Sequence, residues 1–166
     1  MGADTAQVVE LVSEVHRAFR DAARPPDDNI LPSTSVSDEA QEVGDLFSEY
    51  QWQDVPRASL GNNADSIAFM TPEAFVYYLP RYLVEAVEHP REPGSAIVED
   101  LVSHLTPMAS STFVADRLSL MTGEQKRVVA KVLSHVASNA EPFVARRAAE
   151  ALSTLWGTFR TNPLPG

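Results

Sequence analysis

The 166-residue sequence has no cysteine and only seven glycines, and both shortages exclude whole classes of site. Without cysteine, the chain has no disulfide, thiolate zinc site, iron–sulfur cluster or cysteine nucleophile. No two glycines lie within six residues of each other, which excludes a glycine-rich phosphate loop and a dinucleotide fingerprint. A Gly-x-Ser-x-Gly nucleophile elbow is also missing. These absences favour a protein that is not an enzyme, without deciding the question, and we expect no cofactor.

Basic residues are also scarce, because 13 Lys and Arg stand against 23 Asp and Glu, for a net charge of −10. A nucleic-acid binder needs a basic footprint, so direct binding to nucleic acid is not expected. Residues 1–100 carry 19 acidic and 6 basic residues, whereas residues 101–166 carry 4 and 7. No apolar run is long enough to span a membrane, and the first residues do not resemble a secretory signal. We therefore expect a soluble, cytoplasmic protein.

Apolar residues recur at helical spacing along most of the chain, which predicts an all-α fold. We expect a single-domain irregular bundle of five to seven helices over residues 1–160, followed by a frayed tail at residues 161–166. Residues 50–70 are rich in turn formers and are the least helical part of this prediction. Thr122 and Gln125 form a capping box, which marks the start of a late helix.

Pro80 lies inside the helix that Thr71 and Pro72 are expected to begin. The ring removes the hydrogen bond to the Val76 carbonyl, and proline in a helix interior costs roughly 3 kcal/mol. The sequence therefore predicts a kink above about 20°, or a break, within a residue or two of Leu79.

Residues 25–56 contain eight carboxylates and no Lys or Arg. Such a stretch is typical of a solvated surface, or of a docking surface that attracts a basic partner. In the docking interpretation the partner-binding residues are Asp38, Glu39, Glu42, Asp45, Glu49 and Asp54. The chain would then be a small acidic interaction protein of the immunity or antitoxin type, with a basic protein as its partner. The oligomeric state stays open.

The alternative is a small enzyme or ligand-binding protein with a pocket at the Pro80 kink, where a freed carbonyl can face a cavity. The lining of this pocket would consist of Trp52, Tyr77, Tyr78, Tyr82, Asp100 and His104. Trp52 itself fits a buried core position better than an exposed one.

Two histidines follow a carboxylate at i, i+4 helical spacing, Glu85 with His89 and Asp100 with His104. Side chains one turn apart can share a proton or hold a divalent metal. A catalytic zinc site needs three protein ligands, however, and the sequence indicates no third. We therefore expect surface ion pairs and no metal site.

Two runs of the sequence resemble an uncharacterised bacterial domain family. The runs are Trp52-Gln53-Asp54-Val55-Pro56 and Phe69-Met70-Thr71-Pro72-Glu73-Ala74-Phe75-Val76-Tyr77-Tyr78-Leu79-Pro80. They match a core of the form W-x-x-[IVL]-P … F-x-[ST]-P-E-A-F-x-Y-Y-L-P, and Leu105-Thr106-Pro107 and Met121-Thr122-Gly123-Glu124-Gln125 match segments that follow it. The resemblance implies a bacterial cytoplasmic protein and carries no assigned activity.

Overall fold

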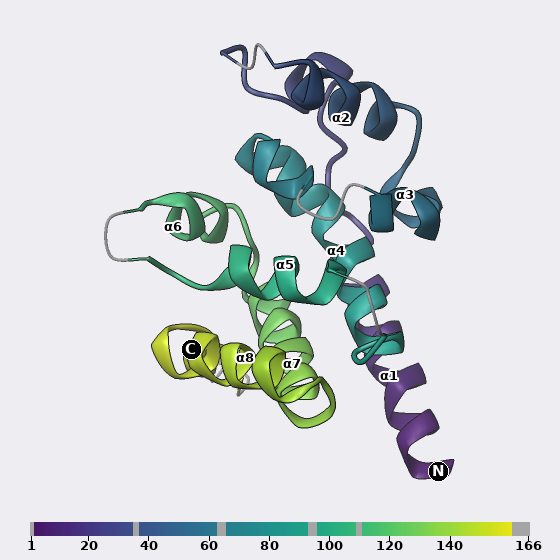
Figure 1. Cartoon of the computed structure of the whole chain (residues 1–166), viewed down its shortest axis with the longest axis vertical. Helices are drawn as coiled ribbons and strands as arrows, with labels where there is room; N and C mark the ends of the chain where they lie inside the picture. Colours follow the sequence, from purple (N-terminus) through teal and green to yellow (C-terminus); the bar gives the residue numbers. More distant parts are fainter. Residues whose placement is uncertain (1, 35–36, 63–65, 93–95, 109–110, 161–166) are drawn as a thin grey trace.

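The computed structural model describes residues 2–34, 37–62, 66–92, 96–108 and 111–160, and within these ranges it contains helices and no strand (Figure 1). The predicted all-α fold is confirmed. The tail expected to fray, residues 161–166, lies outside the described residues. Among the described residues, no helix combines the length and apolar character needed to cross a membrane.

Helix α4 (Pro72–Glu88) is the central element of the fold. It packs against α1 (Gly2–Phe19), α5 (Ile97–Leu105) and α7 (Gly123–Asn139). Helix α8 (Pro142–Thr154) pairs with α7, and the 3₁₀ helix η4 (Trp156–Phe159) covers both. The shorter α2 (Asp38–Ser48) and α6 (Phe113–Leu118) lie at the periphery in Figure 1. One hydrophobic core joins residues from α1 to η4.

Threonine caps fix the starts of the two longest core helices after α1. The Thr71 hydroxyl accepts a hydrogen bond from the Ala74 amide at 3.1 Å and donates to the Asn29 carbonyl at 2.7 Å. It therefore caps α4 and also ties the preceding loop to it. Thr122 and Gln125 form both bonds of the predicted capping box at the start of α7.

Pro80 lies within a single uninterrupted helix, so the break predicted near Leu79 does not occur, and the kink stays a prediction. Almost every residue of α4 is buried, including Leu79, Pro80 and Leu83. Burying one large apolar side chain stabilises a fold by about 1.5–3 kcal/mol. Packing on all sides of α4 therefore offsets the local cost of the proline.

The described residues form eight α-helices, one more than the upper number expected. The additional helix, α3 (Arg57–Asn62), lies in the segment expected to be least helical, together with the 3₁₀ helices η2 (Trp52–Asp54) and η3 (Ser66–Phe69). Pro56 precedes α3, and its carbonyl accepts the amides of Ser59 and Leu60. Leu60 is fully buried, so tertiary packing stabilises a turn of helix that local propensity did not indicate.

Candidate functional site

Helix α2 presents an acidic face to solvent because its apolar residues lie on the opposite side. The Ser37 hydroxyl caps the helix by accepting the Ala40 amide at 3.1 Å. Ala40, Val43 and Phe47 are buried against the rest of the protein. The acidic residues fall between them in the sequence and therefore point outward.

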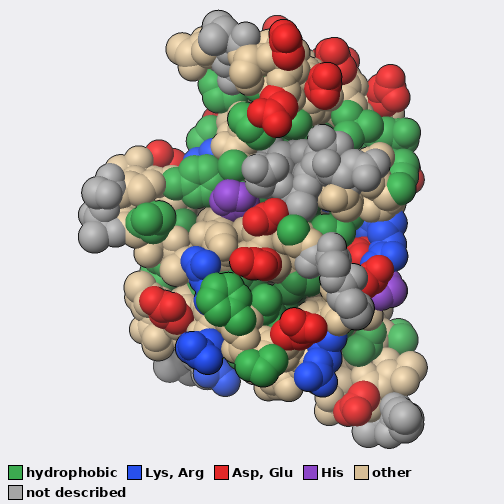
Figure 2. Space-filling view, in the orientation of Figure 1, with side chains coloured by type: hydrophobic (Ala, Val, Ile, Leu, Met, Phe, Trp, Pro, Cys, Tyr) green, Lys and Arg blue, Asp and Glu red, His purple; other side chains and the backbone are tan. Residues whose placement is uncertain are grey.

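All six predicted partner-binding residues are exposed in the structure. Asp38, Glu42, Asp45 and Glu49 follow at spacings of three or four residues, which places them along one stripe of α2 and its C-cap. Asp54 stands apart from this stripe, at the end of η2. Figure 2 shows Asp and Glu side chains gathered over α2 at the top of the view, with the visible Lys and Arg below it.

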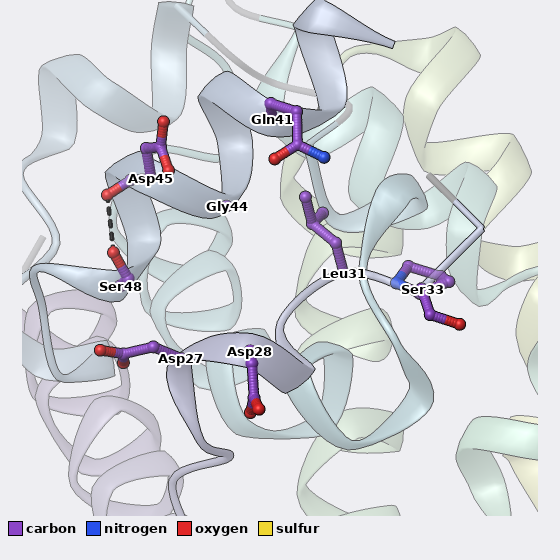
Figure 3. Close-up of a pocket in the computed structure, with 9 residues that line it drawn as sticks. Asp27, Asp28, Leu31, Ser33, Gln41, Gly44, Asp45 and Ser48 are labelled. Carbon is purple, nitrogen blue, oxygen red and sulfur yellow. Dashed lines mark hydrogen bonds between the residues drawn. The ribbon is translucent and has the colours of Figure 1, made fainter. Parts of the chain in front are cut away.

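A pocket of about 300 Å³ opens beside this stripe, where α2 meets the 3₁₀ helix η1 (Asp27–Asn29) (Figure 3). Three acidic residues line it, Asp27, Asp28 and Asp45. The remaining lining residues are Leu31, Pro32, Ser33, Gln41, Gly44 and Ser48. The sequence predicted Asp45 as a site residue but did not place it opposite Asp27 and Asp28.

Gly44 allows the loop after η1 to approach α2 closely. A Cβ atom at this position would lie 2.8 Å from Leu31 Cδ1. A larger side chain would therefore push Leu31 away from the helix. The glycine thus sets the distance between the two acidic segments that border the pocket.

Arg24 is the only Lys or Arg in residues 21–56, and it lies at the edge of this region. It pairs with Asp27 at 3.2 Å and donates a hydrogen bond to the Ser48 carbonyl at 2.6 Å. We define the acidic face by its exposed carboxylates, those of Asp27, Asp28, Asp38, Glu39, Glu42, Asp45 and Glu49. Within residues 21–56 these seven carboxylates stand against a single cation, so the acidic face carries a strong negative charge.

The Tyr78 phenol fixes the C-terminal end of α2 to the core. It donates toward the carbonyls of Phe47 at 2.7 Å and Tyr50 at 3.0 Å. Burial raises the pKa of Tyr78 to about 12 from its usual 10.0, and nearby Arg24 only partly opposes this effect. The C-terminal end of α2, which carries part of the acidic face, is therefore hydrogen-bonded to a core residue of α4.

The aromatic residues of the predicted kink pocket lie in the hydrophobic core, and none has more than 5% of its surface exposed: Trp52, Tyr77, Tyr78 and Tyr82. The Tyr77 hydroxyl accepts the Trp52 amide at 3.3 Å, and the rings of Tyr77 and Tyr78 meet edge to face. Packing on all sides of α4 explains how adjacent tyrosines are both buried. Tyr77 also borders a separate shallow hollow of about 290 Å³ between the α1–η1 loop, α4 and the start of α7.

The other two residues predicted to line the kink pocket lie on α5. Asp100 and His104 are both half-buried. The His104 ring packs against Phe113 of α6, with their centroids 5.8 Å apart. In this place the histidine contributes to the contact between α5 and α6.

A second group of charged residues, which the sequence only partly indicated, surrounds the C-terminal end of α4. Arg57 of α3 donates from Nε to Glu85 at 2.6 Å and also pairs with Glu92. His89 Nδ1 lies 3.6 Å from Glu92 Oε2. The sequence predicted a surface ion pair of Glu85 with His89; in the structure the carboxylate beside His89 is that of Glu92, after the end of the helix, while buried Glu85 pairs with Arg57 and Arg81.

The chain matches, over residues 7–160, the model of a protein family described as a family of unknown function, DUF6714. No curated protein and no solved structure matches the chain. The expected resemblance to an uncharacterised domain family is confirmed, while the bacterial origin and the particular motif stay predictions.

Proposed function

We propose, on the premise that the chain belongs to DUF6714, a family of unknown function, that its acidic face is the docking surface for a basic protein segment. The observation that carries this proposal is that acidic residues of η1 and of α2 line the same pocket. The role corresponds to the immunity- or antitoxin-like interaction protein expected from the sequence. The proposed function is binding, without a catalytic step.

The pocket accounts for how a basic segment would be anchored. An Arg or Lys side chain entering it would lie beside three acidic residues, Asp27, Asp28 and Asp45, whose exposed side chains can turn toward it. Arginine fits best, because its planar guanidinium donates two parallel hydrogen bonds to one carboxylate. Gln41 and Ser48 offer further oxygens at the rim. The anchor therefore selects a cationic side chain with several donors.

The stripe on α2 accounts for attraction at longer range. Its carboxylates are exposed and lie one helical turn apart, so they present several negative charges to the same approaching segment. Clustered charge of one sign raises the rate of association with a partner of opposite charge, and added salt reduces that gain. Binding should therefore weaken steeply with ionic strength.

The test measures binding of a polyarginine peptide to the full chain by fluorescence anisotropy. The variant Asp28→Asn/Asp45→Asn removes two pocket carboxylates at constant size. An exposed ion pair contributes about 0.2–1 kcal/mol, so both changes together should weaken binding roughly two- to thirty-fold. The loss should shrink as salt is added.

The matched control is Glu141→Gln/Glu150→Gln, which changes the net charge equally at exposed positions at the cap and within α8. This control should bind almost as tightly as the unmodified chain. Equal weakening in both variants would show that only net charge matters and would reject the docking surface. Binding that does not respond to salt would reject it as well.

A further inference from the structure

We propose that Glu85, His89 and Glu92 form a binding site for a zinc ion. One nitrogen or oxygen of each residue lies within 4.8 Å of the others. Glu85 and His89 are one helical turn apart at the end of α4, and the turn that follows brings Glu92 beside them. An imidazole with two carboxylates is a ligand set typical of zinc, and it leaves a fourth position open.

The spacing of these atoms is close to that of a tetrahedral site. Zinc bonds of about 2.0–2.1 Å place neighbouring ligand atoms about 3.4 Å apart. The His89 to Glu92 distance is already 3.6 Å. Glu85 is buried and fixed, whereas His89 and Glu92 are exposed by 43% and 37%, so these two can close the remaining gap by rotation.

The Arg57 guanidinium occupies the place that a zinc ion would take between Glu85 and Glu92. Its guanidinium bridges Glu85 and Glu92, while Arg81 lies 3.7 Å from the other Glu85 oxygen. The two carboxylates already attract positive charge to this point, and Arg57 is 44% exposed, which leaves it free to swing outward. Arg57 and zinc should therefore compete for the two carboxylates.

His89 distinguishes a zinc site from an ion-pair cluster. An arginine bridge between two carboxylates needs no imidazole, whereas zinc prefers a nitrogen ligand over water or further carboxylates. The His89 side chain is exposed at the C-cap of α4, where the backbone amide, and not the imidazole, bonds to the Glu85 carbonyl. Removal of the imidazole should therefore affect zinc and leave the fold intact.

The experiment titrates the untagged full chain with Zn²⁺ by isothermal calorimetry. We expect one zinc per chain, binding at least tenfold weaker in His89→Ala, and unchanged binding in His16→Ala. His16 is the matched control because it is also an exposed histidine, on α1. Circular dichroism of each variant verifies that it is folded.

Two further variants test the assignment from opposite directions. Glu92→Gln should weaken zinc binding at least tenfold, whereas Arg57→Gln should strengthen it severalfold by removing the competing cation. Zinc binding that survives His89→Ala, or that Arg57→Gln weakens, would overturn the proposal. Zinc that binds with the same affinity to His89→Ala and Glu92→Gln as to the unmodified chain would identify an adventitious surface site only.

Discussion

Replacing Tyr78 with phenylalanine should lower stability at neutral pH and remove part of its dependence on alkaline pH. The phenol is fully buried and donates toward two carbonyls, those of Phe47 and Tyr50. The single phenol proton is shared between these two carbonyls, and a hydrogen bond contributes about 0.5–1.5 kcal/mol net, so Tyr78→Phe should reduce the free energy of unfolding by about that amount at pH 7.

The alkaline effect follows from the raised pKa of Tyr78, about 12 in the folded protein against 10.0 in the unfolded chain. The unfolded chain releases this proton first, so the contribution is complete below pH 10 and is lost as the pH rises through 12. The difference corresponds to about 3 kcal/mol. Tyr78→Phe has no such proton, and its stability should fall less over this range.

Urea unfolding followed by circular dichroism, at a series of pH values from 7 to 12, measures both effects. Both proteins carry the same other ionisable groups, so the difference between the two curves isolates Tyr78. Parallel loss of stability in the unmodified chain and in Tyr78→Phe would refute the assignment of the buried phenol.

Three further predictions concern a helix cap and two glycines, and all can be measured in the same unfolding assay. Thr122→Ala removes the hydroxyl that accepts the Gln125 amide at 3.1 Å, so it should cost about 1 kcal/mol. Gly157→Ala should destabilise by about 1–3 kcal/mol, because its Cβ would lie 2.6 Å from the Leu152 carbonyl oxygen. Gly61→Ala meets nothing within 4 Å inside α3 and should stabilise by roughly 0.5–1 kcal/mol. Equal effects of the two glycine replacements would contradict this reasoning.

The sequence predicted helices whose signals are local. The capping box of Thr122 and Gln125 lies within four residues, and the structure forms both of its bonds. The sequence of α3 carries no comparable signal, because this helix is stabilised by the burial of Leu60 against segments that are distant in sequence. The same reason applies to Pro80: its cost can be read from the sequence, whereas the packing that keeps α4 continuous cannot.

The candidate sites show the same division between local and distant contacts. The helical period places Asp38, Glu42 and Asp45 on one side of α2, and this much follows from spacing alone. The pocket additionally requires η1 to pack beside α2, which depends on the fit of Leu31 against Gly44. The sequence places both segments in one acidic stretch, residues 25–56, but does not indicate that they are in contact.

Arg117 shows why charge counted along a sequence differs from the charge that a partner meets. It is one of seven basic residues in the positive part of the chain, yet it is only 7% exposed. Its guanidinium lies 3.5 Å from the centre of the Phe113 ring and donates to the Met70 and Phe113 carbonyls at 2.9 and 3.2 Å. Burial lowers its pKa, which is the direction expected when a cation leaves water. This arginine serves to join α6 to the segment before α4, so it contributes little to the surface field. The seven carboxylates of the acidic face are all exposed, so each of them contributes to the electrostatic field at the surface.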